Sequence, residues 1–240
     1  MILWMAVVAA FLFSGGPFGP GEAAPAESPI QGKERAEVIQ RLQERQRAVT
    51  GVRATVIQKK RHPLLAAEAV SQGTLLFKRP NLVRWEVNKP DRTIILIDDR
   101  TLLTYHPDRQ EAERRDLKSD FGARAAVDFF TSGMSLAVAD LEKRFQVDLY
   151  RENGLLVVRL TPRSRFVAQA VASVAIYQDE ADAVPRQIVV VGQKGDRTEL
   201  RLTGVSINPH IPEDAFTLHL GPEVRVTDIG KFASEGGSDR

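Results

Sequence analysis

For most of its length, the chain is a succession of short strand-like segments joined by turns. Turn signals such as Arg79-Pro80-Asn81 and Asp98-Asp99 separate these segments, and no crossover helix stands between successive strands. Strands joined by turns pair antiparallel, which excludes a Rossmann fold or a barrel of βα units. A sheet of about eleven strands must curl or close, so we expect a mainly antiparallel α+β fold. The strand-like segments are 52–57, 73–77, 82–87, 93–97, 101–106, 112–117, 145–151, 155–161, 172–178, 186–192 and 198–207, followed by a shorter one at 215–220.

Two segments have helical periodicity instead. The first is Lys33–Val49, where Val38, Ile39 and Leu42 fall on one stripe and Gly51 ends the pattern. The second is Gly122–Arg144, which we expect Gly133 to divide into two short helices. We expect these helices to cover one face of the sheet.

The first 26 residues have the composition of a secretory signal. An uncharged apolar run at Met1–Phe13 precedes a stretch rich in Gly, Pro and Ala, and the preferred cleavage site follows Ala26, with Ala23 as the rival. A membrane anchor is the alternative, but a span needs about 20 apolar residues. We therefore expect an exported, soluble protein, with one domain at 27–230 and a loose tail at 231–240.

The chain offers little for catalysis or metal binding. It has no cysteine and four histidines, and it contains no phosphate-binding glycine loop, GxSxG or HExxH motif. We interpret Asp98-Asp99 as a hairpin turn, and His106 as a surface residue of the turn at Pro107-Asp108. The sequence therefore predicts no enzyme, no metal and no cofactor.

Basic residues gather between Lys33 and Arg61, where nine stand against three acidic ones. They are either a solvated surface with charged edge strands, or a docking surface for an anionic membrane or acidic partner. The formal net charge of the whole chain is only +2, and we expect no nucleic-acid partner.

Two strand-like segments are apolar on both sides of the pleat. Ile94–Ile97 and Ile188–Val191 lack the alternation of a strand with one wet face. Two-sided packing and a ligand cavity both account for this pattern.

Residues 73–107 carry a specific motif. A Gly-led strand precedes Lys78-Arg79-Pro80-Asn81, Trp85 and Pro90, and then an apolar strand, the Asp98-Asp99 turn and Tyr105-His106-Pro107 follow. This segment resembles the outer-membrane lipoprotein carrier family of LolA-like periplasmic carriers. Leu160-Thr161-Pro162 and Ile211–Leu220 resemble later motifs of the same family more weakly.

The resemblance implies an incomplete, half-open β-barrel with a short helical lid over an apolar cavity. It implies a monomeric carrier that takes lipoprotein acyl chains from an inner-membrane ABC transporter to an outer-membrane receptor or the outer membrane itself. Arg79 would be the lid latch, through bonds to backbone carbonyls of the lid helices. The expected lipid-binding residues are Leu75, Phe77, Val83, Trp85, Val87, Phe129, Phe130, Met134 and Leu136.

Other functions on the same fold stay open at this point. A lipid-sensing regulatory module, or a carrier of a different envelope lipid, would have the same apolar strands. An envelope hydrolase is disfavoured by the missing motifs.

Overall fold

The computed structural model describes residues 28–64, 67–120, 123–124, 127 and 138–229. The predicted signal segment and the C-terminal tail lie outside these residues. The helices are α1 (Gly32–Ala48), α3 (Val138–Arg144) and α4 (Arg165–Ala168), with 3-10 turns η2 (Pro107–Arg109) and η3 (Glu213–Phe216). The strands are β1 (Gly51–Arg61), β2 (Ala69–Lys78), β3 (Leu82–Lys89), β4 (Thr93–Ile97), β5 (Thr101–His106), β6 (Glu111–Asp116), β7 (Phe145–Glu152), β8 (Leu155–Pro162), β9 (Val171–Gln178), β10 (Pro185–Gly192), β11 (Arg197–Ile207) and β12 (Arg225–Ile229).

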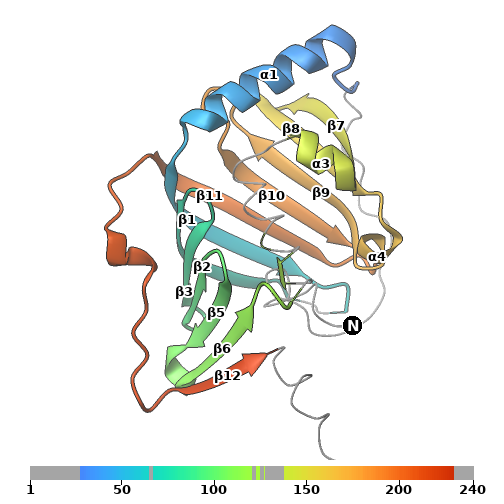
Figure 1. Cartoon of the computed structure of the whole chain (residues 1–240). Coiled ribbons are helices and arrows are strands. Elements are labelled where there is room, and N and C mark those ends of the chain that lie inside the picture. Colours follow the sequence, from blue (N-terminus) through green and yellow to red (C-terminus); the bar gives the residue numbers. More distant parts are fainter. Residues whose placement is uncertain (1–27, 65–66, 121–122, 125–126, 128–137, 230–240) are drawn as a thin grey trace, which may run out of the picture.

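Within the described residues, the twelve strands form one curled sheet in the order β12-β6-β5-β4-β3-β2-β1-β11-β10-β9-β8-β7 (Figure 1). Neighbours pair antiparallel, except that β12 runs parallel to β6. The two meanders meet where β1 pairs with β11, and this pair joins segments about 150 residues apart in sequence. The predicted antiparallel, mainly β class is confirmed.

The C-terminal part differs from the prediction. Residues 215–220 were expected to form a strand, but Glu213–Phe216 form η3 and the following residues are irregular. Pro212 fits this outcome, because its fixed φ suits the start of a helical turn. The last strand is instead β12, whose residues are mostly exposed and lack an alternating apolar pattern. This strand forms because it pairs with β6. Across the pair, the guanidinium of Arg114 donates to both carboxylate oxygens of Asp228.

One face of the sheet carries the core, and we call it the inner face. It is defined by Val52, Ala54 and Val56 of β1, together with the side chains in register with them on the other strands. The opposite side is the outer face. Because side chains alternate between faces along a strand, the register assigns each residue to one of them.

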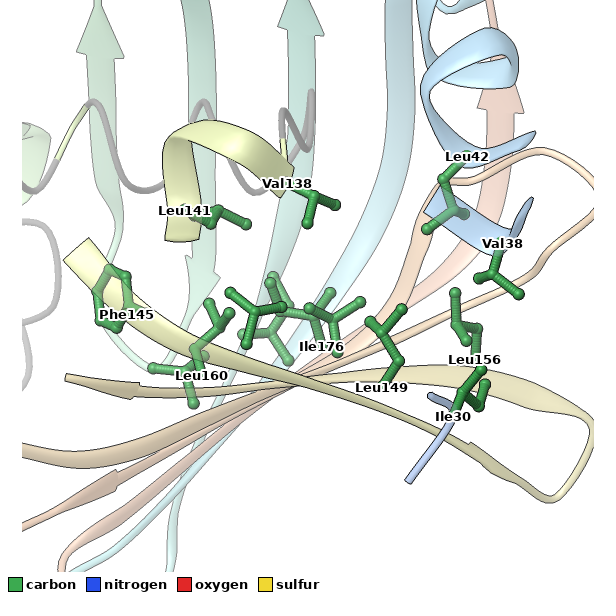
Figure 2. Close-up of a cluster of buried hydrophobic side chains, with 14 of the residues drawn as sticks. Ile30, Val38, Leu42, Val138, Leu141, Phe145, Leu149, Leu156, Leu160 and Ile176 are labelled. Carbon is green, nitrogen blue, oxygen red and sulfur yellow. The ribbon is translucent and has the colours of Figure 1, made fainter. Parts of the chain in front are cut away.

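The helices α1 and α3 cover the inner face of β7–β10. Figure 2 shows Val38 and Leu42 of α1, and Val138 and Leu141 of α3, directed towards sheet residues such as Ile176. These four helix residues are at most 3% exposed, so this half of the sheet has a filled core. Arg35 of α1 also donates to Glu142 of α3 at 2.5 Å, which joins the two helices.

Most of the predicted helical segment 122–144 lies outside the described residues. Its end is α3, and Ala123, Arg124 and Val127 are helical. The short helix α4 was not predicted, since four residues give too little periodicity to detect.

Candidate functional site

The inner face of β1–β5 is lined by two apolar rows of side chains that run across the strands. Cross-strand pairing sets Val52, Phe77, Val83, Ile97 and Leu102 side by side in the first row. All five are at most 3% exposed, because each faces the interior of the curled sheet. The row therefore provides a continuous aliphatic and aromatic surface.

The second row lies beside the first, two residues away from it on each strand. It joins Ala54, Leu75, Trp85 and Ile95, all at most 5% exposed, and ends at the half-buried Thr104. We call the nine apolar residues of the two rows the apolar floor. They are Val52, Ala54, Leu75, Phe77, Val83, Trp85, Ile95, Ile97 and Leu102.

Four of the expected lining residues belong to this floor. Leu75, Phe77, Val83 and Trp85 share the inner face, as their alternation predicts. Val87 lies in a third row and is half-buried. The remaining expected residues, Phe129, Phe130, Met134 and Leu136, lie outside the described residues.

The sequence interpretation did not assign the floor residues on β1, β4 and β5. The alternation of Val52, Ala54 and Val56 was visible, but the pairing that places them beside β2 was not. Ile95 and Ile97 lie within a run that is apolar on both sides, so periodicity alone could not separate their faces.

Part of the helical segment after β6 packs on the apolar floor. Leu117, Ala123 and Val127 are at most 3% exposed and belong to the same apolar cluster. The buried Asp120 fixes where this segment begins, because its carboxylate accepts the backbone N–H of Ala123 at 2.9 Å. Its other oxygen lies 3.5 Å from Arg115 of β6.

Arg79 lies just after β2, next to the C-terminal end of α1. Its Nε donates to the carbonyl of Val49 at 2.5 Å, and one terminal nitrogen donates to the carbonyl of Gln46 at 2.7 Å. A cation suits this position, because the last carbonyls of a helix carry partial negative charge. The observed partners are thus Gln46 in the last turn of α1 and Val49 directly after it, whereas we expected carbonyls of the segment 122–144, most of which lies outside the described residues.

Asn208 holds the same junction from the side of β11. Its amide nitrogen donates to the carbonyl of Ala48 at 2.9 Å, and its oxygen accepts the backbone N–H of Thr50 at 2.7 Å. The end of α1, the start of β1 and the turn after β2 are therefore tied together at one end of the apolar floor.

The two turn candidates have different outcomes. Asp98 accepts the backbone N–H groups of Arg100 and Thr101 at 2.7 and 2.6 Å, which confirms a hairpin turn. His106 was expected on the surface, but it is the last residue of β5, half-buried on the inner face and 3.2 Å from the hydroxyl of Thr93.

Within the described residues, no three His, Asp or Glu side chains are placed to hold a metal ion. No helix in the described part of the chain has the length and hydropathy needed to cross a membrane.

Comparison with known proteins finds relatives that match the segment containing this apolar inner face. A family model described as outer membrane lipoprotein carrier protein LolA matches residues 47–219, which include Arg79 and the whole apolar floor. An outer-membrane lipoprotein carrier protein of Bordetella avium is 26% identical over 160 residues, covering 65% of this chain and 72% of the relative. One of Salmonella paratyphi A is 36% identical over 87 residues, covering 36% of this chain and 43% of the relative.

A solved structure shares the fold. An uncharacterised conserved protein from Thermus thermophilus aligns with a TM-score of 0.50 and 16% identity, covering 82% of this chain and 99% of that one. At this identity, the likeness concerns the fold alone.

Proposed function

The chain belongs to the outer membrane lipoprotein carrier protein LolA family, and on that premise we propose that it is a periplasmic carrier of lipoproteins. The acyl chains would bind against the apolar floor. The observation that supports this most is the pair of apolar rows on the inner face, one across β1–β5 and the other across β1–β4. The residues we propose as lining are Leu75, Phe77, Val83, Trp85, Val87, Phe129, Phe130, Met134 and Leu136.

The energetics explain why such a carrier needs this surface. Each CH₂ group removed from water contributes about 0.8 kcal/mol, so one long acyl chain left in water costs roughly 10 kcal/mol. A cavity with apolar walls offsets that cost without specific polar contacts to the acyl chain. Since no bond is made or broken in this cycle, we assign no catalytic residue.

The burial of the floor is consistent with a closed state of such a carrier. The floor is at most 5% exposed, and Leu117, Ala123 and Val127 pack on it. An acyl chain can reach the floor only when this covering segment moves, so we propose that it is the lid. A lid that closes weakly lets the cargo leave without an energy source.

We propose that Arg79 stabilises the closed state through α1. Its two bonds hold the last turn of α1 against the turn that follows β2. Arg79→Leu removes both bonds and should leave more lipid bound after purification. Arg92→Leu, in the exposed turn between β3 and β4, is the matched control. Equal lipid content in the two variants would refute the latch.

The route is also part of the proposal. Residues 1–26 would direct export, an inner-membrane ABC transporter would load the carrier, and the outer membrane or a receptor there would receive the lipoprotein. Mass spectrometry of the lipid that co-purifies from the periplasm identifies the cargo. Release of a labelled lipoprotein from spheroplasts by the purified protein then tests transport, and binding without release would favour a lipid sensor.

A further inference from the structure

The inner face becomes polar towards the end of β1 that is distant from α1. Beyond Val52, Ala54 and Val56, the next two inner-face residues of β1 are Gln58 and Lys60. Their neighbours in register include Ser71 of β2 beside Gln58, and Thr198 of β11 beside Lys60. The inner face thus changes from apolar rows to hydrogen-bonding groups along a single strand.

The Gln58 amide is buried and only half satisfied. The side chain is 2% exposed, and its oxygen accepts the hydroxyl of Ser71 at 3.0 Å. Its Nε2 has no hydrogen-bond acceptor among the described residues. A buried donor without an acceptor is unfavourable, so an acceptor supplied from outside would bind here with a gain.

Lys60 adds a second donor on the same face. Burial lowers its pKa to about 7, far below the ordinary lysine value of 10.5. Thr198, which is paired in register with Lys60 and only 9% exposed, carries a hydroxyl on the same face. An amide N–H, an amine and a hydroxyl together form a donor-rich end to an apolar surface.

We propose that Gln58 and Lys60 form a polar subsite that binds the hydrogen-bond-accepting oxygens at the head of a lipid whose acyl chains lie on the apolar floor. This inference rests on the proposed carrier function. The oxygens would be the ester and amide carbonyls of an acylated cysteine, or the phosphate of a phospholipid. Both present acceptors beside the point where the acyl chains begin.

The dimensions agree with this orientation. From Gln58 to Val52, β1 advances six residues, or about 20 Å. One leaflet of a bilayer core, which is the depth of a lipid chain, is about 15 Å. A chain whose head binds at Gln58 can therefore extend over the second row at Ala54, four residues or about 13 Å away, and towards the first row at Val52.

Direct binding measurements with matched lipids test the subsite. The probes are a lipopeptide with an N-acylated, diester-linked diacylglyceryl cysteine, its diether analogue without any acyl carbonyl, and a diether phosphatidylglycerol. The first supplies acyl carbonyl oxygens and the third supplies a phosphate, while the second supplies neither of these and keeps only the peptide carbonyls that both lipopeptides share. Affinity for each is measured for the wild type, Gln58→Leu and Lys60→Met.

We expect Gln58→Leu to lower the affinity for the diester lipopeptide or for the phosphatidylglycerol about tenfold, as for the loss of one buried hydrogen bond. Which probe is affected identifies the oxygens. Affinity for the diether lipopeptide should change less than about twofold. Gln178→Leu, which replaces a fully buried glutamine on the inner face of β9, should change none of the three.

The proposal is overturned if both variants bind every probe as the wild type does. Binding of all probes with equal affinity by the wild type would overturn the subsite and leave the carrier function standing. A wild type that binds none of them refutes both.

Discussion

Replacement of Arg79 by leucine should weaken the junction between α1 and the sheet. The side chain makes two charge-assisted hydrogen bonds, to the carbonyls of Gln46 and Val49. Leucine keeps much of the apolar stem but donates to neither carbonyl. Both carbonyls lie at the end of a helix, where intrahelical donors run out, and the carbonyl of Gln46 also accepts the backbone N–H of Val49 at 3.0 Å.

The expected loss follows from these bonds. A hydrogen bond to a charged group contributes about 1.5–3 kcal/mol, and Arg79 is only partly buried, so we take the lower part of that range for each bond. The total is about 3 kcal/mol. For a domain of this size, each kcal/mol lowers Tm by about 2–4 °C, so Tm should fall by roughly 6–12 °C.

Urea and thermal unfolding, followed by far-UV circular dichroism on lipid-free protein, measure this loss. Arg79→Lys should recover only part of it, because an ammonium group cannot match the fork geometry of the guanidinium. The exposed Arg92→Leu should change stability by less than about 0.5 kcal/mol. The reasoning is refuted if Arg79→Leu and Arg92→Leu unfold at the same denaturant concentration.

Three further substitutions test the fold. Gly73→Ala should destabilise by about 3 kcal/mol or more, seen as a lower urea midpoint, because its Cβ would lie 1.8 Å from the carbonyl oxygen of Glu86. Leu42→Ala should cost about 2–5 kcal/mol of unfolding free energy, whereas the exposed Leu64→Ala should cost under about 0.5 kcal/mol. Burial lowers the pKa of Lys60 from 10.5 to about 7 in the folded protein. Its buried charge should therefore destabilise the fold fully below pH 7, where Lys60 is protonated in both states, and not above pH 10.5, where it is neutral in both. Lys60→Met should therefore add about 1–2 kcal/mol at pH 7, after allowance for solvent screening, and should flatten the rise in stability between those pH values; an unchanged pH profile would contradict this.

Local patterns in the sequence predicted the fold class and the first eleven strands. They succeeded because turn chemistry and alternation act within a few residues, as at Asp98 and along Val83–Trp85. They failed for β12, whose strand character depends on pairing with the distant β6. The last strand-like segment was instead predicted at 215–220, where the chain forms η3 and irregular structure.

The candidate site was predictable only in part. Alternation placed Leu75, Phe77, Val83 and Trp85 on one face, and the structure agrees. The acceptors of Arg79 lie 30 and 33 residues earlier in the chain, and no local pattern indicates such a contact. The burial of Gln58 at the polar end of the inner face could not be predicted either, because it results from the register between β1, β2 and β11.

The central claim is that acyl chains bind against the apolar floor, and Trp85 offers a direct test. The sequence has two tryptophans, Trp4 and Trp85, so a protein lacking residues 1–26 retains Trp85 alone. Trp85 is 5% exposed within the floor, and bromine atoms on a bound acyl chain quench a tryptophan that they contact. The control is Trp85→Phe combined with Tyr105→Trp, which moves the fluorophore to the outer face of β5.

With a lipopeptide that carries brominated acyl chains, the account predicts saturable quenching of Trp85 and none of the tryptophan at position 105. Quenching of the outer-face tryptophan alone, or of neither while the lipopeptide remains bound, would contradict it.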